Sequence, residues 1–272
     1  MATQAERAHH FCDLHQRASA FVIPNPWDVG TARTLEHLGF EALATTSSGF
    51  AFSQGLRDNR VGRERVLEHC RALVAATSVP VSADLENGFG DDPSTVAETI
   101  RLAAETGLCG GSIEDATGRP ESPIYEEELA VERVRAAAES VRGLPFPFVL
   151  TARCENFLHG RPDLPDTIRR LQTYQDAGAD VLYAPGLKTA ADITAVVRSV
   201  DRPVNVLMGI AQINLSVAEL SVIGVKRISL GGALARAALG ALLRAVREIR
   251  SDGTFHFTNE AAGTAEIDSL IE

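Results

Sequence analysis

Acidic side chains follow two successive β-rich runs of this sequence at close spacing. Asp84 and Glu86 stand two residues apart after one run, and Glu114 follows the next. Residues two apart on an extended chain point the same way, so Asp84 and Glu86 can aim at one point. Clustered carboxylates repel unless a positive group lies between them, and no Lys or His stands beside these three. Because all the candidate ligands are oxygens, the sequence favours a site for Mg2+, or Mn2+.

Each of these acids also has an ordinary alternative role. Asp84 could cap a helix, and Glu114 could be a solvated acid. Their shared position at the ends of successive strands favours the metal site. Arg153 follows the next run along the chain, and its guanidinium fork can bind a substrate carboxylate through two hydrogen bonds.

Hydroxyl and amide side chains follow other runs. The segment 45–49 reads Thr-Thr-Ser-Ser-Gly, which offers backbone N–H groups to an anion but also suits an ordinary polar turn. Asp58 and Asn59 lie just beyond it, where they either reach the mouth of a pocket or cap a helix that starts near Arg60. Asn205, at a strand end, is a candidate to line the same pocket, and so is Tyr183.

The elements that must position these residues alternate between strand and helix. Continuous apolar runs of this kind suit buried parallel strands, and the segments between them have the periodicity of amphipathic helices. The expected strands cover residues 21–23, 42–44, 79–83, 111–113, 148–150, 181–183, 204–207 and 227–230. The expected helices cover residues 29–38, 63–76, 94–105, 126–141, 164–177, 190–197, 217–223 and 233–250. Several of these helices end at a glycine, which supplies the left-handed turn that closes a helix.

Strands that are each followed by a helix predict an α/β fold, a single (β/α)8 barrel of the TIM type. The alternative, a doubly wound open sheet, would show a phosphate-binding Gly-x-Gly-x-x-Gly in its first turn, and Asn25–Gly30 has none. In a barrel the loops after the strands build the active site, so the residues above are expected to meet at one end. We expect residues 1–252 to form the barrel and residues 253–272 to form a polar C-terminal tail, either a surface arm or an oligomer contact.

The composition is that of a globular protein, with 45% hydrophobic and 23% charged residues in 272. The net charge is 26 − 36 = −10, without a basic stripe, so no nucleic-acid partner is expected. No apolar run reaches the ~20 residues of a membrane span, and residues 1–17 lack the apolar core of a secretory signal. Four cysteines without a Cys-x-x-Cys pair indicate reduced thiols and a cytoplasmic location. Cys109 and Cys154 are expected in the core, and Thr117–Tyr125 is expected to be a mobile lid.

Taken together, these motifs resemble the isocitrate lyase/phosphoenolpyruvate mutase superfamily. The matching segments are Thr46–Gly49 with Gly55–Asp58, Val81–Gly90, Ser112–Asp115 and Thr151–Arg153, and the resemblance covers roughly residues 11–250. It implies a (β/α)8 barrel whose last helix is exchanged between subunits, usually in a tetramer. A homo-oligomer, dimer or tetramer, is therefore expected.

The same resemblance assigns roles to the candidate residues. It implies that Asp84 is the direct metal ligand and that Glu86 and Glu114 hold the metal through water. Arg153 would bind the substrate carboxylate together with the backbone amides of the turn formed by Thr46, Ser47 and Ser48. Asp58 would lie near the reacting group, so Arg153, Asp58 and Glu114 are the expected catalytic residues. The superfamily acts on 2-oxo or 2-hydroxy acids and makes or breaks C–C or P–C bonds.

Departures from the family pattern limit the choice of reaction. The loop 116–125 lacks the Cys and His of the lyases, and Pro185 is followed by Gly186 where the lyases have Glu. Ala184 stands where the mutases and phosphonopyruvate hydrolases have His. We therefore expect a Mg2+-dependent enzyme (lyase, decarboxylase or hydrolase) that cleaves a C–C bond of a small 2-oxo or 2-hydroxy carboxylate through an enolate-like intermediate. The alternatives are P–C chemistry on phosphonopyruvate and a non-catalytic 2-oxo-acid-binding protein.

Overall fold

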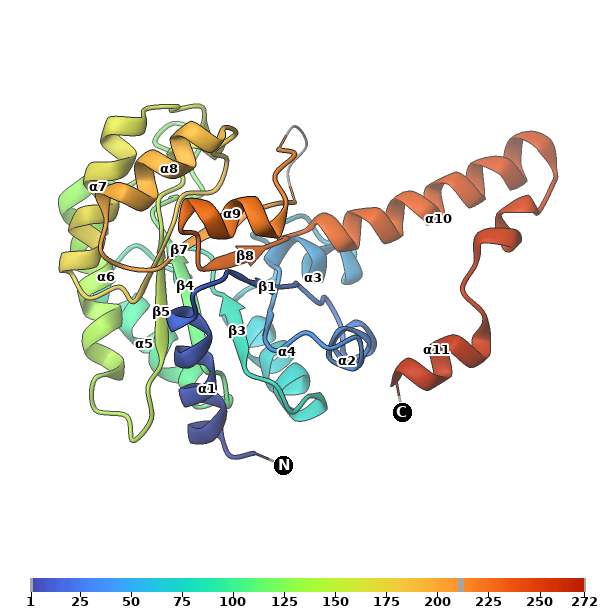
Figure 1. Cartoon of the computed structure of the whole chain (residues 1–272), viewed down its shortest axis with the longest axis horizontal. Helices are drawn as coiled ribbons and strands as arrows, with labels where there is room; N and C mark the ends of the chain where they lie inside the picture. Colours follow the sequence, from blue (N-terminus) through green and yellow to red (C-terminus); the bar gives the residue numbers. More distant parts are fainter. Residues whose placement is uncertain (1, 210–212, 272) are drawn as a thin grey trace.

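A computed structural model describes residues 2–209 and 213–271 of the chain (Figure 1). Eight parallel strands pair in the order β1-β8-β7-β6-β5-β4-β3-β2. A backbone hydrogen bond of 3.0 Å from Ala44 to Pro24 joins the two outer strands and nearly closes the barrel. The predicted (β/α)8 barrel is confirmed. The strands are β1 (Phe21–Ile23), β2 (Leu43–Ala44), β3 (Val81–Asp84), β4 (Gly110–Glu114), β5 (Val149–Arg153), β6 (Val181–Tyr183), β7 (Val204–Leu207) and β8 (Arg227–Ser229).

Helices cover the outside of the barrel, and all eight predicted helices are present with ends within two residues of those expected. The described residues contain α1 (Gln4–Gln16), α2 (Val29–His37), α3 (Ser47–Ser53), α4 (Arg63–Ala76), α5 (Pro93–Ala104), α6 (Glu127–Val141), α7 (Leu164–Asp176), α8 (Ala190–Ser199), α9 (Val217–Ile223), α10 (Ala233–Asp252) and α11 (Thr264–Ile271), with short 3-10 helices at Asn156–His159 and His256–Glu260. Gly178 and Gly224 follow α7 and α9 with φ of 112° and 104°, the left-handed conformation that ends a helix.

The N-terminal helix α1 was not among the predicted elements, because only a narrow stripe of its surface is apolar. Ala8, Phe11 and Leu14 lie on that stripe, and all three are buried against Phe21 and Val149 at the starts of β1 and β5. Thr3 caps the helix reciprocally with the Glu6 side chain. Helix α1 therefore closes the end of the barrel opposite the carboxyl ends of the strands.

The C-terminal part of the chain leaves the barrel. Helix α10 projects away from it (Figure 1), and only Ala235 among its residues is buried. Residues 253–271 are helical in two places, and α11 packs back against α2, where Arg33 donates a 3.1 Å hydrogen bond to the carbonyl of Ile271. The predicted tail thus carries a docked helix. The predicted exchange of the last helix between subunits remains a prediction.

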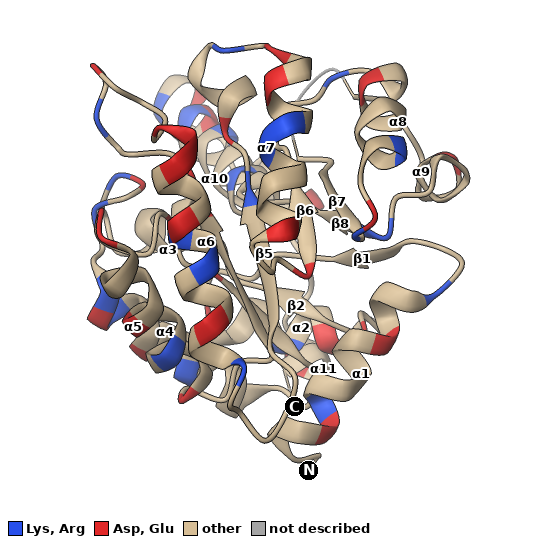
Figure 2. Cartoon of the chain, turned by 90° about the vertical axis from the view of Figure 1, so that its left-hand side faces the viewer, with Lys and Arg blue, Asp and Glu red and all other residues tan. Residues whose placement is uncertain are grey.

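Acidic and basic residues alternate with neutral ones along the outer helices (Figure 2). On α5, for example, Arg101 pairs with both Glu98 and Glu105. Exposed pairs of this kind contribute little to stability but keep the surface polar. Of the helices described, none is both long and apolar enough to cross a membrane.

Candidate active site

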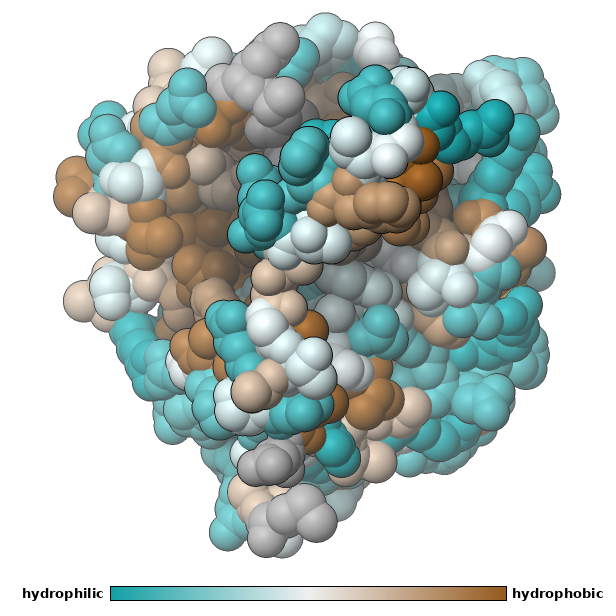
Figure 3. Space-filling model, turned by 90° about the vertical axis from the view of Figure 1, so that its right-hand side faces the viewer, coloured by the Kyte–Doolittle hydropathy of each residue, from teal (hydrophilic) through white to brown (hydrophobic). Residues whose placement is uncertain are grey.

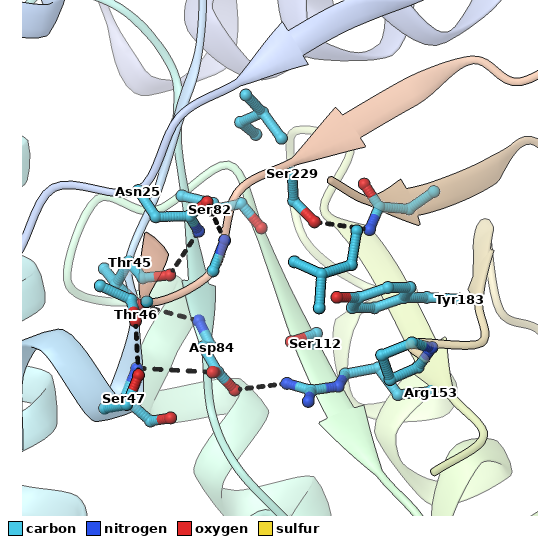
Figure 4. Close-up of a pocket in the computed structure, with 18 of the residues that line it drawn as sticks. Asn25, Thr45, Thr46, Ser47, Ser82, Asp84, Ser112, Arg153, Tyr183 and Ser229 are labelled. Carbon is cyan, nitrogen blue, oxygen red and sulfur yellow. Dashed lines mark hydrogen bonds and ion pairs between the residues drawn. The ribbon is translucent and has the colours of Figure 1, made fainter. Parts of the chain in front are cut away.

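The carboxyl ends of the strands surround a cavity of about 170 Å³ (Figure 4). Short polar side chains form its inner wall, among them Asn25, Ser82 and Ser112. Asn25 ties neighbouring strand ends together: its amide donates to the carbonyl of Thr45 at 2.9 Å, and its oxygen accepts from Gly231 at 2.8 Å. The predicted meeting of polar residues at this end of the barrel is therefore present.

Arg153 is the centre of the charged wall. Its three nitrogens contact three carboxylates: Asp84 at 2.9 Å, Glu114 at 3.1 Å and Glu155 at 2.8 Å. Burial opposes the charge of this guanidinium, but Glu155, Glu114 and Asp84 hold its pKa well above the ordinary value. The sequence neighbours of Asp84 and Glu114 include no Lys or His, yet the next strand places a cation between them. A metal ion is therefore not the sole positive group available to these acids.

Glu155 was missed among the candidate residues. It is buried, and its backbone N–H donates a 2.8 Å hydrogen bond to Asp115. The available signal was its spacing, because Arg153 and Glu155 stand two apart, as Asp84 and Glu86 do. Burial, above all, raises the pKa of the Glu155 carboxyl, while Arg153 opposes that rise.

Glu86 does not point where an extended chain would place it. Strand β3 ends at Asp84, and Glu86 has φ of 51°, so the two side chains line different cavities. Glu86 and Glu114 face a second cavity of about 630 Å³, next to the first, and Asp58 lines both. The extended chain on which the prediction relied therefore ends at Asp84, but the two cavities share Asp58, so a common cation site for Asp84 and Glu86 stays a prediction.

The electrostatics of Glu86 are those of an unsatisfied acid. Its Oε1 atom is buried and has no hydrogen-bond partner among the residues that the structure describes. Burial, followed by the charges of Asp84 and Asp58, raises the pKa of Glu86 to about 8. Burial likewise raises the pKa of Glu114 well above its usual range. These carboxyls could hold a cation, although within residues 2–209 and 213–271 no three Asp, Glu, His or Cys side chains form a complete ligand set.

The hydroxyl segment faces Arg153 across the cavity (Figure 4), where Thr46, Ser47 and Ser48 all line the wall. It is the start of a helix, α3, rather than the predicted turn. Thr46 is the N-cap and accepts a 3.2 Å hydrogen bond from the N–H of Gly49. The N–H of Ser47 lies 3.4 Å from Asp84 Oδ2, so this wall already contacts a carboxylate.

Asp58 lies at the mouth, as one of its two predicted roles requires. The alternative role as a helix cap is wrong, because α4 begins at Arg63 after Gly62. Asp58 is exposed and lines the first cavity together with Ser47. Desolvation nevertheless raises the pKa of Asp58.

Deeper in the barrel, Asn205 does line the cavity, but its amide is held by protein groups. Its Oδ1 accepts a 2.9 Å hydrogen bond from Arg227, and its Nδ2 donates a 2.9 Å hydrogen bond to Ser229. Arg227 was missed, although a charged residue at the start of an otherwise apolar strand was a usable signal. It is buried without an ion pair in the described part of the chain, and burial lowers its pKa to about 10.

The segment predicted as a lid is a short hairpin beside the second cavity. Ala116 and Ile124 form an antiparallel bridge, and the Tyr125 hydroxyl donates a 2.6 Å hydrogen bond to Asp91. Motion of this hairpin remains a prediction. Cys109 and Cys154 are fully buried, which confirms their expected place in the core.

Fold and site together define a TIM barrel with an acid-lined, arginine-centred pocket at the carboxyl ends of its strands. The sequence profile of the phosphoenolpyruvate phosphomutase family matches residues 11–250. The chain belongs to this family, and its relatives and structural neighbours lie in the phosphoenolpyruvate mutase/isocitrate lyase superfamily. The resemblance read from the sequence motifs is thereby confirmed.

Two solved structures illustrate the likeness. A candidate lyase/mutase from Burkholderia cenocepacia J2315 is 63% identical, with a TM-score of 0.96, over 98% of this chain and 95% of that one. A phosphonopyruvate hydrolase in complex with oxalate and Mg2+ is 25% identical, with a TM-score of 0.83, over 99% of this chain and 95% of that one.

Two relatives known from sequence extend the comparison. The uncharacterized protein Rv1998c of Mycobacterium tuberculosis is 32% identical over 89% of both chains. A 2-methylisocitrate lyase of Halalkalibacterium halodurans is 26% identical over 74% of this chain and 67% of its own length. These proteins are similar to the chain across most of the barrel.

Proposed function

We propose that this protein is a Mg2+-dependent enzyme that cleaves a C–C bond of a small 2-oxo or 2-hydroxy carboxylate through an enolate-like intermediate. The observation that carries the proposal is the placement of Arg153 and the Thr46–Ser48 segment on facing walls of one small cavity, with Asp84 between them. A volume of about 170 Å³ suits an acid of a few carbon atoms. Arg153 would bind and orient its carboxylate.

The charge balance supports a divalent cation at this site. Arg153 offers one positive charge to three carboxylates, so the wall has an excess of acid and would repel a substrate anion. Asp84 is the carboxylate inside the cavity, while the unpartnered Oε1 of Glu86 can accept a hydrogen bond from a water on the ion. Mg2+ keeps several waters and needs few protein carboxylates. The residues present therefore fit such an ion, with Asp84 as ligand and Glu86 and Glu114 reached through water.

The chemistry follows from the charge that develops during C–C cleavage. When bound, Mg2+ supplies a Lewis acid that stabilises the negative oxygen of an enolate. Arg153 adds a fixed positive charge next to that oxygen, and one such preorganised group contributes about 3 kcal/mol to lowering the barrier. Asp58 lies at the mouth, where it can exchange a proton with the departing part of the substrate. Neither Cys nor His stands in the 116–125 hairpin, so water would protonate the product.

The relatives support this class of reaction and also a second one. Similarity to a 2-methylisocitrate lyase favours C–C cleavage. The phosphonopyruvate hydrolase structure with oxalate and Mg2+ favours P–C cleavage at the same pocket. Ala184 and the lack of Lys in the hairpin weigh against P–C chemistry. A 2-oxo-acid-binding protein without turnover is the third candidate.

One set of assays separates these candidates. The protein is incubated with oxaloacetate, phosphonopyruvate or methylisocitrate, with and without Mg2+, and product formation is followed. We expect turnover of an oxaloacetate-like acid that stops when EDTA removes the metal. Turnover of phosphonopyruvate alone would replace the proposal by the P–C alternative, and tight binding without any turnover would replace it by the binding protein.

We further propose that the protein is a homo-oligomer, a dimer or tetramer, in which α10 packs on a second copy. Leucine and other apolar residues recur along the exposed helix, namely Leu239, Leu242, Leu243, Val246 and Ile249. Figure 3 looks at the side from which α10 projects and shows hydrophobic surface gathered in a hollow there. Such a surface in water is unfavourable in an isolated chain.

Sedimentation velocity tests this assembly. Leu243→Glu is expected to yield monomers, because a buried charge without a partner opposes packing. Val222→Glu is the matched control, since Val222 is the most exposed of the large hydrophobic residues described and lies on α9. A wild-type monomer, or equal behaviour of the two variants, would contradict the assembly.

A further inference from the structure

The segment between β3 and α5 has an unusual backbone. Within residues 86–91 (the 86–91 loop), two residues that carry side chains are left-handed: Glu86 has φ of 51° and Phe89 has φ of 61°. This conformation brings the Cβ atom close to the following carbonyl oxygen and is unfavourable for residues other than glycine. Such a backbone persists only where neighbouring groups hold it, and strain of this kind is concentrated at functional sites.

One side chain from a neighbouring helix holds the 86–91 loop. Arg133 lies on α6 and is the largest of the fully buried side chains described, with 1% of its surface exposed. Its Nη1 donates hydrogen bonds to the carbonyl oxygens of Gly90, at 2.6 Å, and Asp91, and its Nη2 donates to the carbonyl oxygen of Asn87. The direction of these three bonds is fixed, because a guanidinium only donates and a carbonyl only accepts.

Arg133 binds these carbonyls and does not pair with an acid among the described residues. The carboxylate of Asp91 is occupied by other groups, namely Arg119 at 2.7 Å and the Tyr125 hydroxyl at 2.6 Å. The Tyr125 ring lies against the guanidinium, with its centroid 4.1 Å from the guanidinium carbon of Arg133. Burying a cation without a paired acid is unfavourable unless other groups replace its hydration. The shape of the loop and the position of Arg133 therefore depend on each other.

Glu86 begins this loop and is anchored through its backbone. Its N–H donates to Asp84 Oδ1 at 3.2 Å, and its carbonyl oxygen accepts from the N–H of Glu114 at 3.0 Å. Its side-chain Oε1 atom, in contrast, is buried without a hydrogen-bond partner in the described part of the chain. The direction of the carboxylate thus depends on the course of the loop, whose next residue, Asn87, is bound by Arg133.

We propose that Arg133 is a positioning residue of the proposed metal site: by binding three carbonyl oxygens of the 86–91 loop, it keeps the Glu86 carboxylate directed into the second cavity, where it reaches a divalent ion through water. The inference rests on the proposed function, since it takes Glu86 as an acid of the Mg2+ site. Arg133 itself lines neither of the two cavities. Groups that orient the acids around a metal in this way change its affinity.

Mg2+ affinity, measured by titration calorimetry on the full chain, tests the proposal. Arg133→Met removes all the donors while keeping a long apolar side chain, and is expected to weaken Mg2+ binding about 10-fold. Arg135→Met, on the exposed face of the same helix, is the matched control and is expected to leave the affinity unchanged. Urea unfolding checks that each variant is folded.

Arg133→Lys is the second variant and keeps the test decisive if Arg133→Met does not fold. A single ammonium nitrogen cannot replace the two guanidinium nitrogens that bind separate carbonyls. The loss of about one hydrogen bond is expected to weaken Mg2+ binding about 3-fold. Unchanged Mg2+ affinity in the folded Arg133 variants would overturn the proposed role.

A double-mutant cycle distinguishes positioning from a general structural effect. Glu86→Gln removes the charge that Arg133 is proposed to direct, and is itself expected to weaken Mg2+ binding about 10-fold to 100-fold. In this background a change at Arg133 is expected to have no further effect on Mg2+ affinity, because no carboxylate remains to be directed. Equal losses in both backgrounds would overturn the route through Glu86.

Hydrogen exchange of the metal-free protein measures the hold on the loop directly. The N–H of Gly88 donates to the carbonyl of Leu85 at 2.8 Å, and the N–H of Phe89 donates to Asn87 Oδ1 at 3.1 Å. Both amides are expected to exchange about 10-fold faster in the folded Arg133 variants, because the loop opens more easily. Unchanged exchange would show that Arg133 does not hold the loop.

The proposed function and the role of Arg133 fail differently in these experiments. Mg2+ binding by the wild-type protein, with the same affinity in the Arg133 variants, would overturn the role of Arg133 and leave the proposed function in place. No Mg2+ binding by the wild-type protein would overturn the proposed function itself, and with it the ion that Glu86 is proposed to reach.

Discussion

Two arginines lie inside this barrel, and their surroundings are opposite. Arg153 ends β5 and contacts the carboxylates of Asp84, Glu114 and Glu155. Arg227 starts β8, and its hydrogen-bond partners in the described part of the chain are the neutral side chains of Asn205, His15 and Thr151. The pKa of Arg153 is held well above the ordinary value, whereas burial lowers that of Arg227 to about 10.

The difference shows how the barrel separates charge along its axis. The mouth carries more acid than base, which suits a cation, while the deep end carries Arg227, which forms no ion pair with any described residue. An anion bound between them would have a metal near the mouth and a positive field beneath it. Arginine thus binds carboxylates at the mouth of the barrel and orients neutral hydrogen-bonding groups at its deep end.

The largest contrast is expected in stability. Arg153→Met removes the partner of three acids and is expected to cost about 3–5 kcal/mol of unfolding free energy at pH 7. Arg227→Met also loses hydrogen bonds but removes an unpaired buried charge, so its cost should not exceed about 2 kcal/mol. Urea unfolding of both variants measures this. A larger cost for Arg227→Met would show that the two sites do not differ as described.

Metal affinity tests the acidic end of the comparison. Asp84→Ala is expected to weaken Mg2+ binding by more than about 100-fold, the largest loss usual for an outer-shell partner, while circular dichroism shows a folded barrel. Calorimetric titration with Mg2+ checks it, and Asp176→Ala on the outer helix α7 is the control. Unchanged Mg2+ affinity in the Asp84 variant would refute the metal assignment.

Carboxylate binding tests the role of the Arg153 fork. Arg153→Ala is expected to weaken oxalate binding about 100-fold, since hydrogen bonds to charged groups contribute about 1.5–3 kcal/mol each. Cys70→Ala, a change in the buried face of α4, should leave the affinity unchanged. Comparable losses in the two variants would mean that the carboxylate binds elsewhere.

The dependence of the unfolding free energy on pH tests the deep end of the barrel. The folded-state pKa of His15 is about 3, below the ~6.5 of an unfolded chain. Between these two pKa values the unfolded state therefore binds more protons than the folded state. The stability that the neutral, buried His15 contributes is complete above about pH 6.5 and is lost as the pH falls. Between pH 7 and pH 5 the loss is about 2 kcal/mol. His15→Gln should remove this part of the slope and His9→Gln should not, as measured by urea unfolding at each pH.

Much of the fold was predictable because its signals are local. The periodicity of residues 63–76 and 217–223 gave helices α4 and α9 without error at either end. Helix α1 was not predicted, because its stability comes from packing three apolar residues against the starts of strands that are far away in the sequence. The outward course of α10 has no local signal either, since the helix itself was expected over nearly the same residues.

The candidate site likewise has parts that the sequence predicted and parts that it did not. Asp84, Arg153 and the Thr46–Ser48 segment could be placed on one cavity because parallel strands bring their carboxyl ends together. The direction of the Glu86 side chain could not be predicted, since it depends on a positive φ after the strand. The sequence also did not show that the Asn205 amide is held by protein groups, because one of these groups is Arg227 from the neighbouring strand.

The order of the apolar runs and the polar residues that follow them were enough to determine a barrel, its family and the end of the barrel at which these polar residues meet. The acids that Arg153 contacts and the cavity that each carboxylate faces were decided by tertiary structure alone. The physical reason is that strand periodicity acts between neighbours in the sequence, whereas hydrogen-bond direction and desolvation arise only among side chains that folding brings together.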